Sequence, residues 1–456
     1  MQTQKIPTPY TLHPAPCTLP PAPTDCRILF VRISQQAVPY ERPALTKSYI
    51  KGKVQSPKLG GMHCVQLEEL MRRRIDVKLC SKAISIDWEK REVLLQSTRF
   101  GDAMEEVAAF KHLVLATGSS PIMLDVPGAS LGNVLYAKTV VDIDRIKKQM
   151  VPGKRAVVVG GGYIAMEVGA ALRCAGVETT IVVRGDRLNP RLFNRNMSTF
   201  IEQVYTDHGV KIQKERTVVE LVGSGKNVTG VKLEGGAVLD CDFVVVGIGS
   251  AANMDLLEGS GVETGACSAT GKPGIVVDEY FRTNVEGVYA VGDACLFPCK
   301  KAGGKLVQDL HVLHARESGR KAARVILGKP LTPYDPIPHQ YSSVDEWGFA
   351  WRFWGLTSGE PILIGNMTND DGWYALWFDQ EGKLCGAMHC AVDVEVRFLA
   401  GARGHVRVQE LADEIFLFLI FNSCLVSLPS LDLKAKSSWM HVGGKCLTRD
   451  DVRAGC

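Results

Sequence analysis

The sequence predicts an α/β fold built from Rossmann-like units, with a smaller antiparallel-sheet domain toward the C-terminal side. Three observations carry this prediction. From Arg27 on, short β-branched runs alternate with helical patterns, and several of the runs end at glycine. One run leads into a G-x-G-x-x-A sequence that begins at Gly160. Beyond Pro333, aromatic-rich runs follow one another without helical segments between them, which favours an antiparallel sheet.

Length and composition exclude several classes of protein. The 456 residues leave room for about three domains. The chain is 46% hydrophobic and 22% charged, as expected of a globular protein, and its formal net charge of +4 gives no case for a nucleic-acid partner. Its 14 cysteines form no CxxC pair, so we expect neither a disulfide scaffold nor a metal site. No apolar run reaches the ~18 residues of a membrane helix, so we expect no membrane association.

Both ends of the chain differ from its middle. Residues 1–26 are rich in proline, so we expect this start to be disordered. They lack the pattern of a secretory signal, and we expect a cytoplasmic protein, with plastid, mitochondrial or peroxisomal forms as alternatives. Residues 405–456 form an atypical tail, whose apolar run at 415–428 is short for a bilayer span. We expect a packed helix or a transcript artefact there, with a tail anchor as the alternative.

The strand-like runs before Pro333 favour mainly parallel sheets, because helical segments separate them. In chain order these runs are residues 27–33, 77–86, 112–118, 155–162, 179–184, 242–249 and 287–293. The aromatic-rich runs of the last domain are residues 348–355, 372–378 and 383–390.

The G-x-G-x-x-A sequence predicts a dinucleotide site, because strand, loop and helix follow one another in register. Gly160 permits the tight turn, and Gly162 lets a pyrophosphate approach the backbone. Ala165 lets the helix pack closely on the strand, and the helix N-terminus favours the phosphate. A purely structural glycine turn is the less favoured alternative.

The end of the next strand-like run predicts which nucleotide binds. Arg184 and Arg187 stand where an acidic residue would hold a free ribose 2′-hydroxyl, and arginines suit a 2′-phosphate better. This pattern favours NADPH over NADH. Two solvated surface arginines remain the open alternative.

Two more strand-like runs close on small-residue turns, at Ala116-Thr117-Gly118 and at Gly292-Asp293. Together with the intervening nucleotide motif, they resemble the flavoprotein reductases that bind two dinucleotides. The resemblance implies two Rossmann-like dinucleotide-binding domains, namely an FAD domain with an NAD(P) domain inserted in it, plus a C-terminal α+β interface domain. It also implies that Asp293 hydrogen-bonds the ribityl chain of FAD.

Four segments narrow the resemblance to the monodehydroascorbate reductases. They are residues 39–49 (PYERPALTKSY), 190–193 (PRLF), 311–316 (HVLHAR) and 338–342 (PHQYS), and the likeness covers roughly residues 27 to 400. It implies FAD and NADH or NADPH as cofactors, and the monodehydroascorbate radical as a small-molecule acceptor. Hydride would pass to FAD, and two single-electron transfers to two radicals would follow.

The resemblance also carries roles to individual positions. Lys47 and Glu167 match a charged pair near the flavin, where a carboxylate keeps the lysine charged and oriented. Arg316 would bind the anionic acceptor, and Tyr341 would lie beside flavin and acceptor. The expected FAD-binding residues are Arg42, Lys47, Ile84, Ala116, Thr117, Gly118, Lys138, Asp293, Val312 and Tyr341. The expected NAD(P)-binding residues are Gly160, Gly161, Gly162, Tyr163, Ile164, Glu167, Arg184, Arg187, Arg191, Gly249 and His311. For each of them an ordinary core, surface or interface residue is the alternative.

The expected domain boundaries follow from the same resemblance. The FAD domain comprises residues 27–140, without a glycine-loop unit, and residues 265–334. The NAD(P)H-binding domain lies between them at 141–264, and the antiparallel-sheet domain follows at 335–404.

The chain departs from the family pattern in several places. No strand–GxGxxG–helix unit precedes Pro39, so the helix N-terminus that would hold the FAD pyrophosphate has no counterpart, and we expect impaired FAD binding. Gly185 replaces a glutamate that selects NADH, Leu310 replaces another glutamate, and Lys138 replaces an arginine. Ser343 also replaces an arginine, which removes one expected anion contact.

Three other functions are compared with the residues that each would require. A disulfide reductase is disfavoured, because the only C-x4-C pair, Cys385 and Cys390, lies in a strand-like run and its members would point to opposite faces. Two alternatives stay open. One is a reductase of this architecture that uses ferredoxin or a quinone, and the other is an FAD-deficient, non-catalytic form. The oligomeric state is left as monomer or homodimer.

Overall fold

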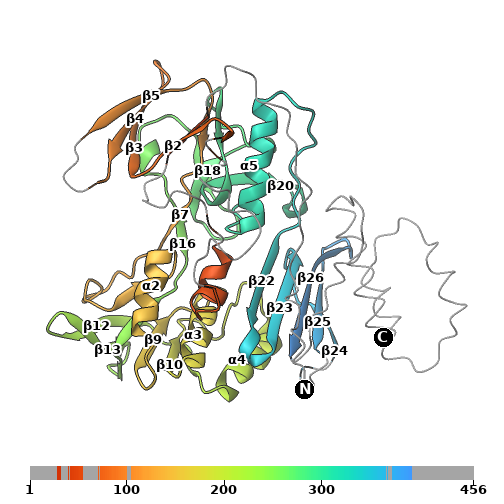
Figure 1. Ribbon diagram of the computed structural model, residues 1–456. Coiled ribbons are helices and arrows are strands. Elements are labelled where there is room, and N and C mark those ends of the chain that lie inside the picture. The colour runs from red at the N-terminus through yellow and green to blue at the C-terminus, as the bar shows by residue number, and fades with distance from the viewer. Residues whose placement is uncertain are drawn as a thin grey trace, which may run out of the picture.

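The computed structural model describes residues 28–31, 40, 42–54, 70, 72–99, 104–365, 367 and 372–392. The expected disordered start at 1–26 and the atypical tail at 405–456 lie outside these residues. Figure 1 shows three groups of elements: a parallel sheet with its helices, a set of small sheets around one helix, and an antiparallel sheet. This arrangement matches the α/β architecture expected from the sequence, whereas the exact domain boundaries remain predictions.

A five-stranded parallel sheet in the order β11-β10-β9-β15-β8 forms the centre of the first group. Its middle strand is buried at every residue from Ala156 to Val159, as expected of a parallel strand covered on both faces. The strands are β8 (Val134–Tyr136), β9 (Arg155–Val159), β10 (Glu178–Val182), β11 (Lys211–Gln213) and β15 (Phe243–Val246). The helices are α2 (Val140–Gln149), α3 (Tyr163–Cys174) and α4 (Arg195–Asp207).

A three-stranded antiparallel sheet packs on this parallel sheet, which the sequence reading did not anticipate. It consists of β12 (Val218–Ser224), β13 (Asn227–Leu233) and β14 (Val238–Asp240). Leu221 and Val231 share a buried cluster with Val157 and Val244 of the parallel sheet. The cluster therefore fixes the sheet against one face of the nucleotide-binding unit.

The second group contains two separate parallel pairs. β1 (Ile28–Val31) pairs with β2 (Ile75–Lys78), and β6 (Leu113–Leu115) pairs with β19 (Val288–Ala290). These two pairs share no strand within the described residues. In a doubly wound sheet the first strand is central, so their separation agrees with the absence of a first glycine-loop unit from the sequence.

The remaining elements of this group are short and mostly antiparallel. The predicted strand at 77–86 is divided, because Cys80 adopts a φ of +52° and ends β2 before β3 begins. The further strands are β3 (Ser81–Asp87), β4 (Glu92–Ser97), β5 (Glu105–Ala109), β7 (Ser119–Pro121), β16 (Ser250–Ala252), β17 (Thr264–Ala266), β18 (Pro273–Val276), β20 (Cys295–Cys299) and β21 (Lys305–Val307). The helical elements are η1 (Leu45–Tyr49), η2 (Asp255–Leu257), η3 (Gly292–Ala294), η4 (Lys300–Ala302) and α5 (Val312–Ile326).

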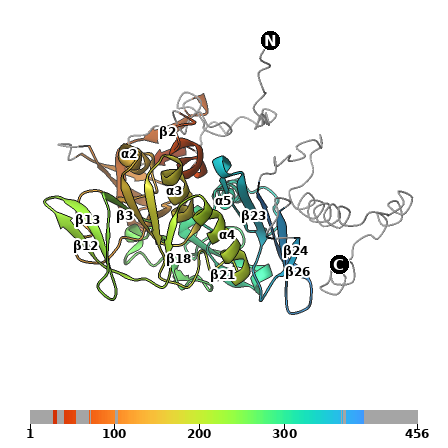
Figure 2. The same cartoon turned by 90° about the horizontal axis from the view of Figure 1, so that it is seen from below.

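The antiparallel sheet expected beyond Pro333 is present in the order β22-β23-β26-β25-β24. Its elements are β22 (His339–Val344), η5 (Asp345–Trp347), β23 (Phe349–Gly355), β24 (Ile362–Gly365), β25 (Trp373–Phe378) and β26 (Leu384–Val392). The sheet lies beside α3 and α4, as the two views in Figures 1 and 2 show.

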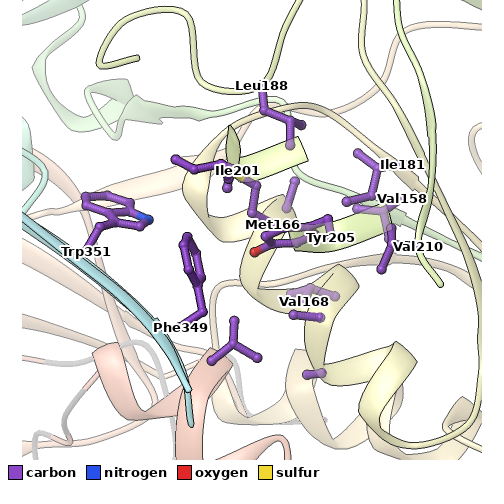
Figure 3. Close-up of a cluster of buried hydrophobic side chains, with 14 of the residues drawn as sticks. Val158, Met166, Val168, Ile181, Leu188, Ile201, Tyr205, Val210, Phe349 and Trp351 are labelled. Atoms are coloured by element: carbon purple, nitrogen blue, oxygen red, sulfur yellow. The ribbon is translucent and has the colours of Figure 1, made fainter. Parts of the chain in front are cut away.

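One face of this sheet packs against the nucleotide-binding unit. Figure 3 shows Phe349 and Trp351 directed toward Ile201 and Tyr205 of α4. The edge of Phe193 meets the ring of Trp351 with 5.5 Å between centroids. Because side chains alternate along a strand, the opposite face carries the other set of residues, including Tyr341.

Candidate functional site

Glu167 joins three segments that are far apart in the sequence. It lies in the first half of α3 and is only 2% exposed. Its Oε1 atom accepts from the Nζ of Lys47 at 2.6 Å and from the hydroxyl of Ser342 at 2.7 Å. Its Oε2 atom accepts from the hydroxyl of Thr46. Three donors thus compensate the burial of this carboxylate.

Lys47 connects this carboxylate to an aromatic side chain. It lies in η1, a single turn of π-helix, and its side chain is 17% exposed. Its Nζ lies 4.9 Å from the ring centroid of Tyr341 on β22, within cation–π range. The sequence-predicted residues Lys47, Glu167 and Tyr341 therefore meet at one place, between η1, α3 and β22.

The N-terminus of α5 faces the same place. His311 is the N-cap residue, and its Nδ1 accepts from the backbone N–H of Leu313 at 3.3 Å. Its ring centroid lies 5.8 Å from that of Tyr341. Burial, followed by the charges of Lys47 and Arg316, lowers the pKa of His311 to about 4. The imidazole is consequently neutral at neutral pH, and the nearby positive charge comes from the lysine, the arginine and the helix end.

Two other predicted residues follow His311 on α5. Val312 is the first residue of the helix, and the half-buried Arg316 lies one turn further on. Because the charge of Arg316 acts on His311, the guanidinium belongs to the surroundings of the Tyr341 ring.

A second polar cluster forms around Asp293 in η3. Its Oδ2 atom accepts from the hydroxyl of Ser119 at 2.6 Å and lies 3.2 Å from the Nζ of Lys138. Burial lowers the pKa of the Lys138 ammonium, and the charge of Asp293 opposes that shift. Arg42 is tied to this cluster, because its guanidinium donates to the backbone oxygen of Lys138 at 2.7 Å.

The turn at Ala116-Thr117-Gly118 borders the same cluster. Gly118 has a φ of +70°, and a Cβ there would meet nothing within 4 Å. Thr117 donates from its hydroxyl to the backbone oxygen of Asn253 at 2.7 Å. Ile84 lies in β3 at a register shift between Ala83 and Ser85, and its role in FAD binding remains a prediction.

These residues fit the flavin end of FAD. The Nε2 atom of His311 is buried and has no hydrogen-bond partner within the described chain, and the space at Gly118 is open. Asp293 and Lys138 supply an acceptor and a donor of the kind that ribityl hydroxyls and phosphate require. A second glycine loop that could cradle the FAD pyrophosphate does not occur in the described residues before β6.

The predicted nucleotide loop connects β9 to α3. Gly160 has a φ of +123°, and a Cβ there would lie 2.3 Å from the backbone oxygen of Gly247. Gly162 is the N-cap of α3, and a Cβ there would meet nothing within 4 Å. The fully buried Ala165 packs on the backbone of Gly247 in turn. The loop therefore combines close strand–helix packing with open space at the helix N-terminus, where Gly161, Tyr163 and Ile164 also lie.

Burial raises the pKa of one aromatic residue in this loop, Tyr163, and the charge of Glu167 adds to the effect. The phenol therefore stays protonated at all ordinary pH values. It stands at the first position of α3, four residues before Glu167, and so on the same side of the helix. Tyr163 thus lies between the nucleotide loop and the place where Lys47, Glu167 and Tyr341 meet.

The arginines after β10 differ in their availability. Arg184 is exposed, whereas Arg187 forms two 3.0 Å hydrogen bonds with Asp186 and a third with a backbone oxygen. Arg195 also binds Asp186, at 2.7 Å. The one acidic side chain in this loop is therefore neutralised twice, which leaves it poorly suited to hold a ribose diol.

Two other predicted nucleotide residues lie near Lys272. A Cβ at Gly249 would lie 2.9 Å from the Nζ of this lysine. Burial lowers the pKa of Lys272, and the charge of the exposed Arg191 acts in the same direction. Gly249 and Arg191 are thus brought to the same region, beyond the C-terminal end of β15.

Several residues of the site had not been expected from the sequence. Thr46 and Ser342 complete the hydrogen bonding of Glu167, and Ser119 completes that of Asp293. Arg216 lies beside the loop that follows β10, because its backbone N–H donates to the oxygen of Val183 at 3.1 Å. Its side chain is exposed. Thr46 precedes Lys47 and Ser342 follows Tyr341 in the sequence, and this adjacency to predicted residues is the feature that could have identified them.

The cysteines of the described chain form no redox pair. Cys385 and Cys390 lie in β26, the first half-buried and the second fully buried. The prediction that they point to opposite faces is wrong, because a register shift beside Cys385 breaks the alternation and both cysteines pack in the same core cluster. Cys295 is buried with its sulfur 3.5 Å from the Nε2 of His314, and burial raises the pKa of that thiol. No group of three or more potential metal-binding side chains occurs among the described residues.

Comparisons with known proteins agree with this geometry. The family model described as pyridine nucleotide-disulphide oxidoreductase matches residues 22–317. A protein of Pisum sativum named monodehydroascorbate reductase is 35% identical over 381 residues, covering 78% of this chain and 83% of that protein. A protein of Oryza sativa subsp. japonica named monodehydroascorbate reductase 5, chloroplastic, is 32% identical over 371 residues, covering 78% of this chain and 72% of that protein.

The similar solved structures include a ferredoxin reductase for the CYP199A2 system from Rhodopseudomonas palustris. It is 29% identical, has a TM-score of 0.71, and the match covers 80% of this chain and 84% of that one. Other relatives carry names that place them in peroxisomes. Among the described residues, no helix has the length and apolar character needed to cross a membrane.

Proposed function

The chain belongs to the pyridine nucleotide-disulphide oxidoreductase family, and from this membership we propose that it regenerates ascorbate from the monodehydroascorbate radical at the expense of NAD(P)H. One NAD(P)H and one proton would reduce two radical anions to two ascorbate anions. The meeting of Lys47, Glu167 and Tyr341 beside Arg316 is the observation that carries this proposal, and no disulfide joins the cysteines that the structure describes.

FAD, when bound, accepts a hydride and releases its two electrons singly, which suits a radical acceptor. The residues of the chain would prepare its surroundings. Lys47 would place a positive charge beside the flavin ring, and Glu167 would keep that lysine charged and fixed in position. The N-terminus of α5 would add its partial positive charge, while the neutral His311 adds none.

The acceptor would bind at the outer side of the same cluster. Arg316 offers a planar fork of donors to the ring oxygens of an ascorbyl anion, and Tyr341 offers an aromatic face and a hydroxyl. The surroundings are cationic and partly buried, which would strengthen the attraction for a small anion.

We favour NADPH as the reductant. Arg184 and Arg216 are both exposed beside the end of β10, where the 2′-position of an adenine ribose would lie. Asp186 is held by Arg187 and Arg195, so it offers little to an unphosphorylated ribose. For the compartment we retain the cytoplasm as the prediction, and imaging of the tagged chain would test it.

Two alternatives have specific support. A ferredoxin-type acceptor is favoured by the likeness to the ferredoxin reductase and by the loss of an arginine at Ser343. An FAD-deficient form is favoured by the two parallel strand pairs, which share no strand within the described chain. In that form the intact loop at Gly160 would still bind nicotinamide nucleotide.

Spectroscopy of the purified full chain tests these possibilities in order. The visible spectrum is recorded before and after addition of NADPH or NADH, and we expect a flavin spectrum that bleaches. Ascorbyl radical, a ferredoxin and a benzoquinone are then compared as oxidants of the reduced protein. Fastest reoxidation by the radical supports the proposal, and fastest reoxidation by ferredoxin contradicts it. A colourless chain that still binds NADPH would identify the FAD-deficient form.

A further inference from the structure

A row of four polar and aromatic residues crosses the outer face of the C-terminal sheet. Strand register places Tyr341 opposite Arg352, Arg352 opposite His389, and His389 opposite Tyr374. Directly opposed residues on adjacent strands lie on the same face with their Cβ atoms about 5 Å apart. Arg352 is therefore the immediate neighbour of Tyr341, on the face opposite to that of Ser342.

The next row of the same face is aromatic. His339 stacks between Tyr341, with ring centroids 5.7 Å apart, and Trp354, at 5.3 Å. Its ring also meets that of His311 at 5.3 Å. Both ring nitrogens of His339 are buried and have no hydrogen-bond partner within the described chain. The floor of this region is thus made of flat rings.

Three cations act on the histidine rings of this region. Burial lowers the pKa of His339 to about 3, and the charge of Arg352 contributes. The charge of Arg352 also lowers the pKa of His389 on its other side. Lys47 and Arg316 act in the same way on His311. Arg352 is therefore the third cation around the rings, approaching from β23.

Arg352 lies near Ser343, a position at which the family pattern has an arginine. Ser343 lies two residues after Tyr341 on β22 and so shares its face, but it supplies no charge where the family pattern has an arginine. Its partner across the strands is Ala350, which supplies none either. Arg352 lies two residues beyond Ala350 on the same face, one strand away from the vacant position.

We propose that Arg352 is an acceptor-binding residue, which supplies from β23 the anion contact that Ser343 no longer supplies from β22. The ligand is a small, flat, singly charged anion with several oxygen atoms, of which ascorbate is the stable representative. It lies over Tyr341 and His339, between Arg316 and Arg352. This inference rests on the proposed function, because it concerns the same acceptor.

Binding of ascorbate to the purified full chain tests this inference without turnover. Isothermal titration calorimetry is performed on the wild type, Arg352→Gln, Arg352→Lys, and the double variant Ser343→Arg/Arg352→Gln. A charge-assisted hydrogen bond accounts for about tenfold in affinity. We expect about tenfold weaker binding for Arg352→Gln and partial retention for Arg352→Lys. We expect recovery in the double variant, which returns the charge to β22.

A matched control and a second assay make the outcomes distinct. Arg145→Gln removes an exposed arginine from α2 and should leave ascorbate affinity unchanged. Steady-state reduction of the ascorbyl radical by NADPH is the second assay, in which Arg352→Gln should raise the KM for the radical more than it lowers kcat. If the wild type binds ascorbate and Arg352→Gln binds it equally well, the inference about Arg352 is overturned while the proposed function stands. If the wild type does not bind ascorbate, both are overturned.

Discussion

Ser342 and Glu167 are 175 residues apart, and the serine hydroxyl donates a 2.7 Å hydrogen bond to the glutamate Oε1 atom. The same oxygen accepts from Lys47. The contact fixes β22 of the C-terminal sheet against α3 of the nucleotide-binding unit. Tyr341 and Ser342 point to opposite faces of β22, so the hydrogen bond of one residue sets the orientation of the other.

Replacement of Glu167 by glutamine should reduce the stability of the fold. The variant leaves the Lys47 ammonium, only 17% exposed, without an opposite charge. We expect the free energy of unfolding to fall by about 2 kcal/mol, which is below the range for a fully buried pair because the lysine retains some solvent. Urea unfolding measures the loss.

An exposed ion pair provides the control for this variant. Glu220 and Lys232 lie 2.9 Å apart with side chains about two-fifths exposed, so Glu220→Gln should cost at most about 0.5 kcal/mol. Equal losses for Glu167→Gln and Glu220→Gln would show that the Lys47 pair has no special structural role.

Stability should decrease as the pH falls below neutrality. Burial lowers the pKa of His311, His314 and His389 to about 4 and that of His339 to about 3, whereas an unfolded chain has a histidine pKa near 6.5. The unfolded chain therefore binds more protons than the folded chain below pH ~6.5, and stability is lost progressively toward pH ~4. Asp309 opposes this trend by one proton, because burial raises its pKa to about 7.

Urea unfolding at several pH values between 4.5 and 7.5 checks this prediction. The slope of the unfolding free energy should be positive over this interval. Substitution of His389 by glutamine should lower the number of protons taken up on unfolding, which sets this slope, by about one, and should leave the sign of the slope unchanged. A flat profile would mean that these histidines remain solvated in the folded chain.

Discrimination between the two nicotinamide nucleotides should depend on two exposed arginines. Arg184→Gln and Arg216→Gln each remove a charge beside the end of β10, and each should weaken NADPH binding by about tenfold. NADH lacks the 2′-phosphate, so its affinity should change little. Fluorescence titration of both nucleotides gives the comparison, with Arg145→Gln as the control. Equal effects on NADH and NADPH would exclude a contact to the 2′-phosphate.

The sequence predicted those features that depend on local pattern. Burial of β9 and the turn at Gly160 follow from a β-branched run that ends in a glycine loop, and both are present. The partners of Glu167 were only partly foreseen, because Ser342 reaches it through packing of a sheet on a helix from another domain. The proximity of Arg352 to Tyr341 likewise depends on strand register, which alternation along one strand leaves undetermined.

Two glycines of the nucleotide loop should respond differently to alanine. At Gly160 the φ is +123° and a Cβ would lie 2.3 Å from the backbone oxygen of Gly247. Gly160→Ala should therefore destabilise the fold by about 1–3 kcal/mol. At Gly162 the space is open within 4 Å and the φ is −78°, so Gly162→Ala should leave the melting temperature nearly unchanged.

Nucleotide binding should separate the two variants in the opposite sense to stability. In Gly162→Ala the added methyl group occupies the space through which a pyrophosphate would approach the start of α3, so NADPH affinity should fall by about tenfold or more although the fold is intact. Thermal unfolding with and without NADPH measures both quantities in one experiment, since a bound nucleotide raises the melting temperature. Normal stabilisation of Gly162→Ala by NADPH would mean that the pyrophosphate does not lie at this helix N-terminus.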